Sequence, residues 1–418
     1  NSQMSVYRKY ENGSKEGIWK SWHDDGKQWD EQTYVNNKKE GKSKRWRYGE
    51  IREYKGQYQD DKKTGKWIYY YASGLKEYEG KYKNGKKEGK WVVFYKDALI
   101  PVLQHRPKRG DLVYVNGKRH DKWIYYHPNG EVFANEEYDN GKKIGHWISW
   151  HDNGNQWSEK NYINGKKHGV FKKWRSNGIP EYVGQYKNDK EIGEWVYYYD
   201  NGQKEYQGNY ENGKRVGKWF KFDEDTGKKS GKLNYVNGKL TGEYIEYNED
   251  GLVILSGQYK NGKKEGKHIY IGDNGKKRKE EIYIDGKLNG VFKEWHPNSN
   301  LWFEFQYKDG IKQGFCKSFH FNGECSADEN WNNGKKDGKF DYYHDNGIKK
   351  IKSTYFSNKL NGKYIEWYKN GNLKKEIGYK KDILDGNYIE YHVSDQHRGK
   401  GKMKNDEMNG KWIFWHHN

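Results

Sequence analysis

Short runs of aromatic and β-branched residues alternate along the chain with polar turns rich in glycine, asparagine and lysine. Residues 82–95 read YKNGKKEGKWVVFY, and close copies begin at Tyr162, Tyr210 and Tyr259. Each copy has one turn of the Asn-Gly type and a second turn such as HDNG or NEDG, and these residues accept the positive φ of tight turns. The residues between the turns are types typical of strands. The pattern predicts an all-β fold built from antiparallel hairpins.

A glycine two residues before an aromatic position marks the period, which is 24 residues. One interval is 25 residues, and another is 56 residues and contains Asp121 where a glycine is expected. Counting Asp121, the chain holds 17 units, so we expect about 34 strands in one continuous meander. The repeat glycines are Gly17, Gly41, Gly65, Gly89, Gly145, Gly169, Gly193, Gly217, Gly242, Gly266, Gly290, Gly314, Gly338, Gly362, Gly386 and Gly410.

Three aromatic columns run through the units. The first column lies two residues after the repeat glycine and is aromatic except at Ser43, His268 and Cys316. The second column lies three residues later, and the third lies seven residues before the glycine. Side chains three apart in a strand point to opposite faces, so the first and second columns should lie on opposite faces of the sheet.

The spacing also predicts dimensions and boundaries. Strands lie ~4.8 Å apart, so each unit should advance roughly 9.6 Å and the array should reach on the order of 160 Å, an elongated ribbon or solenoid. We expect repeats 1–4 in residues 1–95, an insertion in residues 96–113, and repeats 5–17 in residues 114–418, continuous with the first array.

Two segments carry a family resemblance: YEGKYKNGKKEGKW at Tyr78 and YQGNYENGKRVGKW at Tyr206. Their pattern, Y-x-G-x-Y-x-N-G-x-x-x-G-x-W, resembles the MORN repeat. Many units lack the glycine of Y-x-G-x-Y, as in EEYDNGKKIG at Glu136, which favours the 24-residue variant found in bacterial YwqK-type antitoxin-like proteins. The resemblance implies an elongated β-ribbon that acts as a scaffold in cilia, in cytoskeletal complexes or at membranes. Lipid binding has been attributed to the family.

The composition indicates whether the chain is ordered, which compartment it suits and which partners its charge favours. Aromatic residues make up 17% of the chain, which argues against disorder although the mean hydropathy is −1.40. The net charge of +20 favours polyanionic partners, and the alternative is a solvated lysine-rich surface. The two cysteines, Cys316 and Cys325, fit a reducing, intracellular compartment. No apolar run approaches the ~20 residues of a membrane span, and no signal peptide is visible.

The sequence offers no catalytic constellation and predicts no cofactor. Histidines follow the second column in eight units, but adjacent units should hold them ~9.6 Å apart, too far to share one metal ion. We therefore expect these histidines to end strands and to hydrogen-bond near the turns, and we predict no metal site. Glu77, Glu205 and Glu280 have lysine neighbours and indicate a solvated face. The rings repeat as packing columns, so nucleic acid is not an expected partner.

Lysines of the NGKK turns are the candidate binding residues. Every unit except the last, NDEMNG at Asn405, carries Lys or Arg there, so stacked turns would form a basic edge. Such an edge could bind acidic lipid headgroups or acidic protein tails, or it could serve only to block aggregation. The predicted residues are Lys38, Lys39, Lys62, Lys63, Lys86, Lys87, Lys142, Lys143, Lys166, Lys167, Lys214, Arg215, Lys263, Lys264, Lys335 and Lys336.

The insertion contains a short apolar run, Leu99, Ile100, Pro101, Val102 and Leu103. An insertion at a turn can leave the sheet and project, so this run is a candidate docking loop; alternatively it packs back on the sheet. The leading hypothesis is a non-enzymatic scaffold in a larger intracellular, cytoplasmic assembly, cytoskeletal or ciliary. The alternatives are a peripheral membrane module that binds acidic phospholipid, and an antitoxin-like or immunity-like binding protein.

Overall fold

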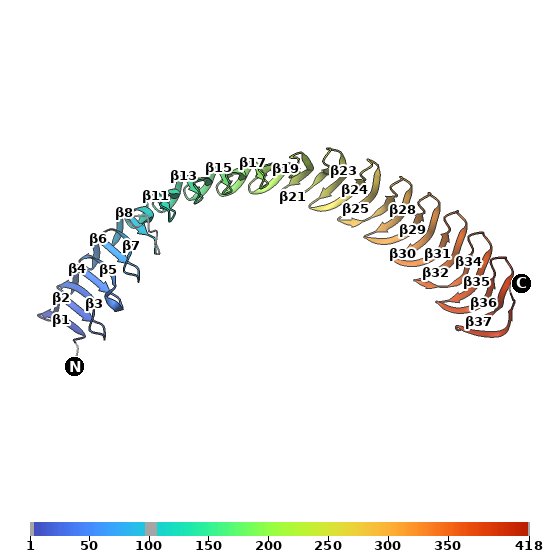
Figure 1. The fold of residues 1–418 in the computed structure, drawn as a ribbon, viewed down its shortest axis with the longest axis horizontal. Coiled ribbons are helices and arrows are strands. Elements are labelled where there is room, and N and C mark those ends of the chain that lie inside the picture. The colour runs from blue at the N-terminus through green and yellow to red at the C-terminus, as the bar shows by residue number, and fades with distance from the viewer. Residues whose placement is uncertain (1–3, 97–106, 417–418) are drawn as a thin grey trace. The chain divides into compact units, whose positions relative to one another are not determined.

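The computed structural model of the protein describes residues 4–96 and 107–416. These residues form 38 β-strands and one short 3-10 helix, and the contacts divide the chain into two compact units, residues 1–214 and 215–418. Within each unit, consecutive strands pair antiparallel in chain order (Figure 1). The predicted all-β meander of hairpin repeats is confirmed.

The first unit contains these elements: β1 (Val6–Glu11), β2 (Ser14–Trp22), β3 (Gln28–Val35), β4 (Lys38–Trp46), η1 (Tyr48–Glu50), β5 (Arg52–Gln59), β6 (Lys62–Tyr70), β7 (Lys76–Lys83), β8 (Lys86–Phe94), β9 (Lys108–Val115), β10 (Lys118–Arg119), β11 (Asp121–Tyr126), β12 (Val132–Asp139), β13 (Lys142–Trp150), β14 (Gln156–Ile163), β15 (Lys166–Trp174), β16 (Pro180–Lys187), β17 (Lys190–Tyr198) and β18 (Lys204–Glu211).

Strand β19 (Lys214–Phe222) begins at the last residue of the first unit. The second unit continues with β20 (Lys229–Val236), β21 (Lys239–Leu240), β22 (Gly242–Tyr247), β23 (Val253–Lys260), β24 (Lys263–Ile271), β25 (Lys277–Ile284), β26 (Lys287–Leu288), β27 (Gly290–Trp295), β28 (Leu301–Lys308), β29 (Ile311–Phe319), β30 (Cys325–Asn332), β31 (Lys335–Tyr343), β32 (Lys349–Phe356), β33 (Lys359–Leu360), β34 (Gly362–Trp367), β35 (Leu373–Lys380), β36 (Ile383–Tyr391), β37 (His397–Lys404) and β38 (Glu407–Phe414). Four strands are divided near the repeat glycine position, and counting each once turns 38 strands into the expected 34.

Turn chemistry explains the hairpins. In the Asn-Gly turn between β7 and β8, Asn84 and Gly85 have φ of 48° and 78°, the two positive values that a type I′ turn requires. In the second turn, the amide of Gly154 donates to the carbonyl of His151 at 3.1 Å. The repeat glycine also has positive φ, and Asp121 adopts φ of 54° in its place. These positions therefore demand residues that tolerate the left-handed region.

The first-column residues form much of the buried core of the repeats. Trp67 and Trp219 are 0% exposed, and the non-aromatic exceptions are equally buried, with Ser43 at 1% and Cys316 at 0%. Third-column rings pack between first-column rings: Trp67 lies 5.2 Å from Tyr58 between ring centroids, and 5.8 Å from the next such ring. Every hairpin thus buries its rings against those of its neighbours, as repeat proteins require.

The glycine of Y-x-G-x-Y makes room for these rings. Gly80 lies opposite Trp91, and a Cβ at Gly80 would come within 2.2 Å of Trp91 Cδ2. Gly56 and Gly184 lie equally close to their tryptophans. The indole ring therefore lies directly on the glycine backbone, which explains why this motif carries Gly and Trp together.

Hydrogen bonds also join hairpins that are about one repeat apart in sequence. The amide of Gly85 donates to the carbonyl of Lys63 at 2.9 Å, and the amide of Asp60 donates to Glu40 Oε2 at 3.0 Å. Each Asn-Gly turn is thus held by the strand of the preceding hairpin. The glutamate of the KKEG sequence takes part in this contact, which gives it a structural role.

Within the predicted insertion, residues 108–113 belong to β9, which pairs with β8 and β11. The pairing register shifts between Val93 and Phe94, so an irregularity separates the first and second columns in β8, and their placement on opposite faces stays a prediction. Trp91 packs on Tyr78 and Tyr82, whereas Phe94 lies beside Lys76. The proposed docking residues, Leu99 to Leu103, lie outside the described residues.

Candidate partner-binding surfaces

The sixteen basic residues predicted to form one edge fall into two groups of eight. We call the residue directly after the Asn-Gly or equivalent turn the first lysine, and the next residue the second lysine. The first lysines are exposed: Lys38, Lys62, Lys86, Lys142, Lys166, Lys214, Lys263 and Lys335. The second lysines, one of which is an arginine, are half-buried: Lys39, Lys63, Lys87, Lys143, Lys167, Arg215, Lys264 and Lys336.

Second lysines lie over the aromatic columns. Lys63 Nζ is 4.5 Å from the ring centre of Trp67 and 5.3 Å from that of Tyr82. Lys87 repeats the arrangement at 4.4 Å from Trp91. Burial lowers the pKa of both amines, and the charge of the second lysine in the preceding repeat, Lys39 for Lys63 and Lys63 for Lys87, lowers it further. These cations cover the core rings and are positioned for packing and cation–π contact.

First lysines extend from the edge into solvent. Lys38 pairs with Asp60 at 2.9 Å, and Lys263 pairs with Asp285 at 2.7 Å. The other six first lysines make no ion pair within residues 4–96 and 107–416. Lys86 lies directly opposite Lys83 in its hairpin, and like charges in that position destabilise a sheet. The edge is therefore a series of exposed cations that the fold itself does not neutralise.

The histidine column forms contacts between hairpins. The Nε2 atom of His127 lies 3.1 Å from the carbonyl oxygen of Trp150, and His320 Nε2 lies 3.0 Å from that of Tyr343. Tyrosine takes the same role elsewhere, because the hydroxyl of Tyr368 donates to a carbonyl 23 residues later at 3.1 Å. The predicted structural role is confirmed, with the partner in the next hairpin, for His127, His151, His296, His320 and His344.

Among the described residues, no group of three or more histidine, cysteine, aspartate or glutamate side chains is arranged to hold a metal ion. Glu280 pairs with Lys267 at 2.6 Å and with Lys277 at 3.2 Å, so it has the lysine neighbours expected from the sequence, but its side chain is 13% exposed and does not lie on a solvated face. Within the same part of the chain, no helix has the length and apolar character needed to cross a membrane.

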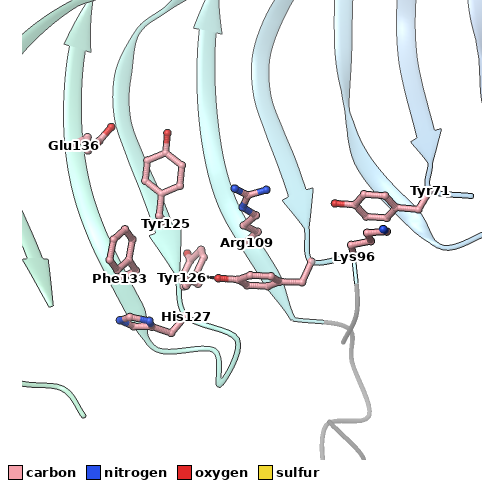
Figure 2. A pocket seen from close by; sticks show the side chains of 9 residues that line it. Tyr71, Lys96, Arg109, Tyr125, Tyr126, His127, Phe133 and Glu136 are labelled. Carbon is pink, nitrogen blue, oxygen red and sulfur yellow. Dashed lines mark hydrogen bonds between the residues drawn. The ribbon is translucent and has the colours of Figure 1, made fainter. Parts of the chain in front are cut away.

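A hollow of about 690 Å³ lies on the sheet near the second-turn ends of β8, β9, β11 and β12 (Figure 2). It is lined by Tyr71, Tyr95, Lys96, Arg109, Tyr125, Tyr126, His127, Phe133 and Glu136. Sequence reasoning missed this hollow. One signal was present, because Gly110 and Ala134 occupy positions that four other repeats fill with a tyrosine, namely Tyr54, Tyr78, Tyr182 and Tyr206.

Hydrogen bonds fix the walls of the hollow. The hydroxyl of Tyr95 donates to the carbonyl of Tyr126 at 2.6 Å, and the Tyr126 hydroxyl donates to Asp111 at 2.9 Å. Burial and, to a lesser extent, the Glu136 carboxylate raise the pKa of Tyr125 to about 12, while the charges of Arg119 and Arg109 oppose the shift. The walls therefore hold phenols together with two cations, Lys96 and Arg109, and one anion, Glu136.

The fold and these surfaces define a β-hairpin repeat protein. The family model described as the MORN repeat variant matches residues 15–36, 167–188, 191–212, 288–309 and 360–381. The chain therefore contains MORN-type repeats at these five places. A search of curated proteins gives no match.

Two solved structures that match the chain are distant from it in both sequence and structure. The crystal structure of TcdB2-TccC3-Cdc42 is 10% identical, covering 96% of this chain and 25% of that chain, with a TM-score of 0.15. The Photorhabdus luminescens Tc holotoxin pore is 9% identical, covering 92% of this chain and 27% of that chain, with a TM-score of 0.13. The chain thus spans about a quarter of the length of these structures, and the scores carry no argument about its fold or function.

Proposed function

We propose that the protein is a non-enzymatic scaffold that binds protein partners through the exposed first lysines, within a larger intracellular assembly of the cytoskeletal or ciliary kind. The observation that carries the proposal is the division of the turn cations. The second lysines pack over the aromatic rings of the columns, as Lys63 does on Trp67 and Lys87 on Trp91. Two first lysines pair with aspartates, and the other six have no carboxylate partner in the described part of the chain. A repeated row of free cations favours an extended, acidic surface on a partner protein.

The test is recovery of proteins from native extract by the intact chain, identified by mass spectrometry. The first variant changes four first lysines to glutamine: Lys62, Lys86, Lys142 and Lys166. The matched control changes four exposed strand lysines of the same unit to glutamine: Lys42, Lys81, Lys90 and Lys122. Specific acidic partners retained by the control and lost by the first variant would support the proposal. Equal recovery by the two variants would contradict it.

Binding to acidic phospholipid is the second candidate, because the same free cations suit an anionic surface. Each basic residue near such a surface contributes about 1 kcal/mol. Sedimentation with vesicles of phosphatidylserine and phosphatidylcholine separates the two candidates. Vesicle binding that is removed by moderate salt and by the four first-lysine substitutions, without specific protein partners, would favour the membrane function.

A further inference from the structure

The hollow beside Arg109 lies next to two repeats that carry a small residue where some other repeats carry a tyrosine ring. We define a fourth column, four residues before the third column, where Tyr54, Tyr78 and Tyr182 provide large rings. Tyr78 lies opposite Tyr69, and Gly110 and Ala134 lie at the equivalent positions opposite Val93 and Tyr125. Gly110 and Ala134 thus lack the fourth-column ring, as does Ser158 in the following repeat. The hollow lies beside the first two of these positions, where the neighbouring residues Arg109 and Phe133 line it.

Aromatic walls surround this space. The side chains of Tyr125, Tyr126 and Phe133 lie on one side of Arg109, with Phe133 the farthest from it in the view of Figure 2, and the ring of His127 lies 5.1 Å from that of Phe133 in a T-shaped contact. Ring pairs at this separation and geometry are favourable beyond their buried area. A volume of about 690 Å³ is ample for one aromatic side chain and its flanking backbone.

The positive charge of Arg109 determines which aromatic ligands suit the hollow. Arg109 is exposed and makes no ion pair or hydrogen bond with the described residues, although its charge acts on Tyr95 and Tyr125. Glu136 already accepts a hydrogen bond from the Tyr138 hydroxyl at 2.8 Å. The unsatisfied donor in the hollow is thus a guanidinium, whose planar donors match a carboxylate in two-point contact.

We propose that this hollow binds an aromatic side chain of a partner polypeptide that lies next to a carboxylate. The ring occupies the space of the absent fourth-column tyrosines, and the carboxylate pairs with Arg109. The inference rests on the proposed scaffold function and specifies the chemistry of one partner segment. An acidic segment is also the type that the free first lysines attract, so both surfaces favour the same class of partner.

The test uses the intact chain and a short fluorescent peptide with one tyrosine between glutamates, measured by anisotropy. Arg109→Gln removes the pairing cation and should weaken binding roughly tenfold, the scale of a lost charge-assisted hydrogen bond. Ala134→Tyr places in the fourth column the ring that Tyr78 and Tyr182 provide in other repeats and should weaken binding by a similar factor. Lys42→Gln is the control, since it removes the same charge from an exposed strand position outside the hollow and the turn edge and should leave affinity within roughly twofold.

Two further peptides define the ligand. Replacing tyrosine by serine, or the glutamates by glutamines, should each weaken binding to the unmodified protein. The proposal is wrong if the starting peptide does not bind, or if Arg109→Gln and Ala134→Tyr bind it as the unmodified chain does while circular dichroism shows both to be folded. If Lys166→Gln, a substitution at the turn edge, weakens binding and the two hollow variants do not, the peptide binds the turn edge: the hollow is then excluded, while the proposed scaffold function stands.

Discussion

At the scale of single residues, position 268 shows how tightly the first column is packed. His268 replaces the usual aromatic residue and is 0% exposed, with Nε2 2.9 Å from the carbonyl oxygen of Gln258. A Cβ on Gly257 would come within 2.2 Å of His268 Nδ1. The position is therefore defined by burial and close backbone approach, and tolerates a change of residue type.

Gly257→Ala should destabilise the protein by about 1–3 kcal/mol, because the buried ring must move to admit one methyl group. The matched control is Gly272→Ala, where the nearest atom to the added Cβ is 3.5 Å away and neither glycine has positive φ. The control should change stability by less than about 0.5 kcal/mol. Urea unfolding followed by tryptophan fluorescence measures both, and equal effects would contradict the packing argument.

His268 should also make stability depend on pH. Burial lowers its pKa in the folded protein below the ordinary value of 6.5, and the contact with Gln258 opposes that shift. The unfolded chain then binds more protons as pH falls, so this contribution is fully present above pH 6.5 and is lost progressively below it. His268→Phe should abolish this part of the pH dependence. Unfolding free energies that change with pH identically in both proteins would show that His268 does not contribute.

At the scale of the element, each hairpin separates packing lysines from exposed ones. Lys63→Ala removes a cation from Trp67 and Tyr82 and uncovers the rings, so we expect a loss of about 1 kcal/mol. Lys62→Ala, at the adjacent exposed position, should change stability by less than about 0.5 kcal/mol. Thermal unfolding of the two variants tests the division, and a larger effect at Lys62 would reverse it.

Contacts between hairpins can be tested at the second-turn edge. Tyr368→Phe removes only the hydroxyl that donates to Tyr391, and should cost about 0.5–1.5 kcal/mol. Tyr7→Phe serves as the control, because Tyr7 is 49% exposed and its hydroxyl has no hydrogen-bond partner within the described ranges. Denaturant midpoints should shift for the first variant alone. No shift for Tyr368→Phe would mean that this contact adds nothing to stability.

The repeat period made the strands and the buried first column predictable, including exceptions such as Cys316. The two-residue alternation of a strand could also have separated Lys62 from Lys63, because positions 63, 65 and 67 share one parity. The difference between the two lysines was missed because both were assigned to the same exposed turn. The bonds from one hairpin to the next could not be predicted, since they depend on bulges that set which atoms meet. The hollow depends on two small residues whose effect appears only when adjacent units are aligned.

At the scale of the whole molecule, the repeated contacts predict that stability is distributed over the hairpins. Each hairpin packs its rings on adjacent hairpins, and each turn bonds to the preceding strand. In such arrays stability is approximately a sum of unit and neighbour terms. The account therefore predicts that strand amides are protected from exchange throughout both compact units of the chain. Removal of one core ring should lower this protection only in the hairpins near it.

Hydrogen–deuterium exchange of the intact chain and of Trp195→Ala tests this claim most directly. Trp195 is 3% exposed and packs on Tyr182 and Tyr186, and its loss should cost about 3–5 kcal/mol locally. We expect protection in strands of every described hairpin of the unmodified protein. In the variant, exchange should accelerate in β16 to β18 and fade within the adjacent hairpins. Uniform acceleration across the chain, or protection confined to one block of strands, would contradict the account.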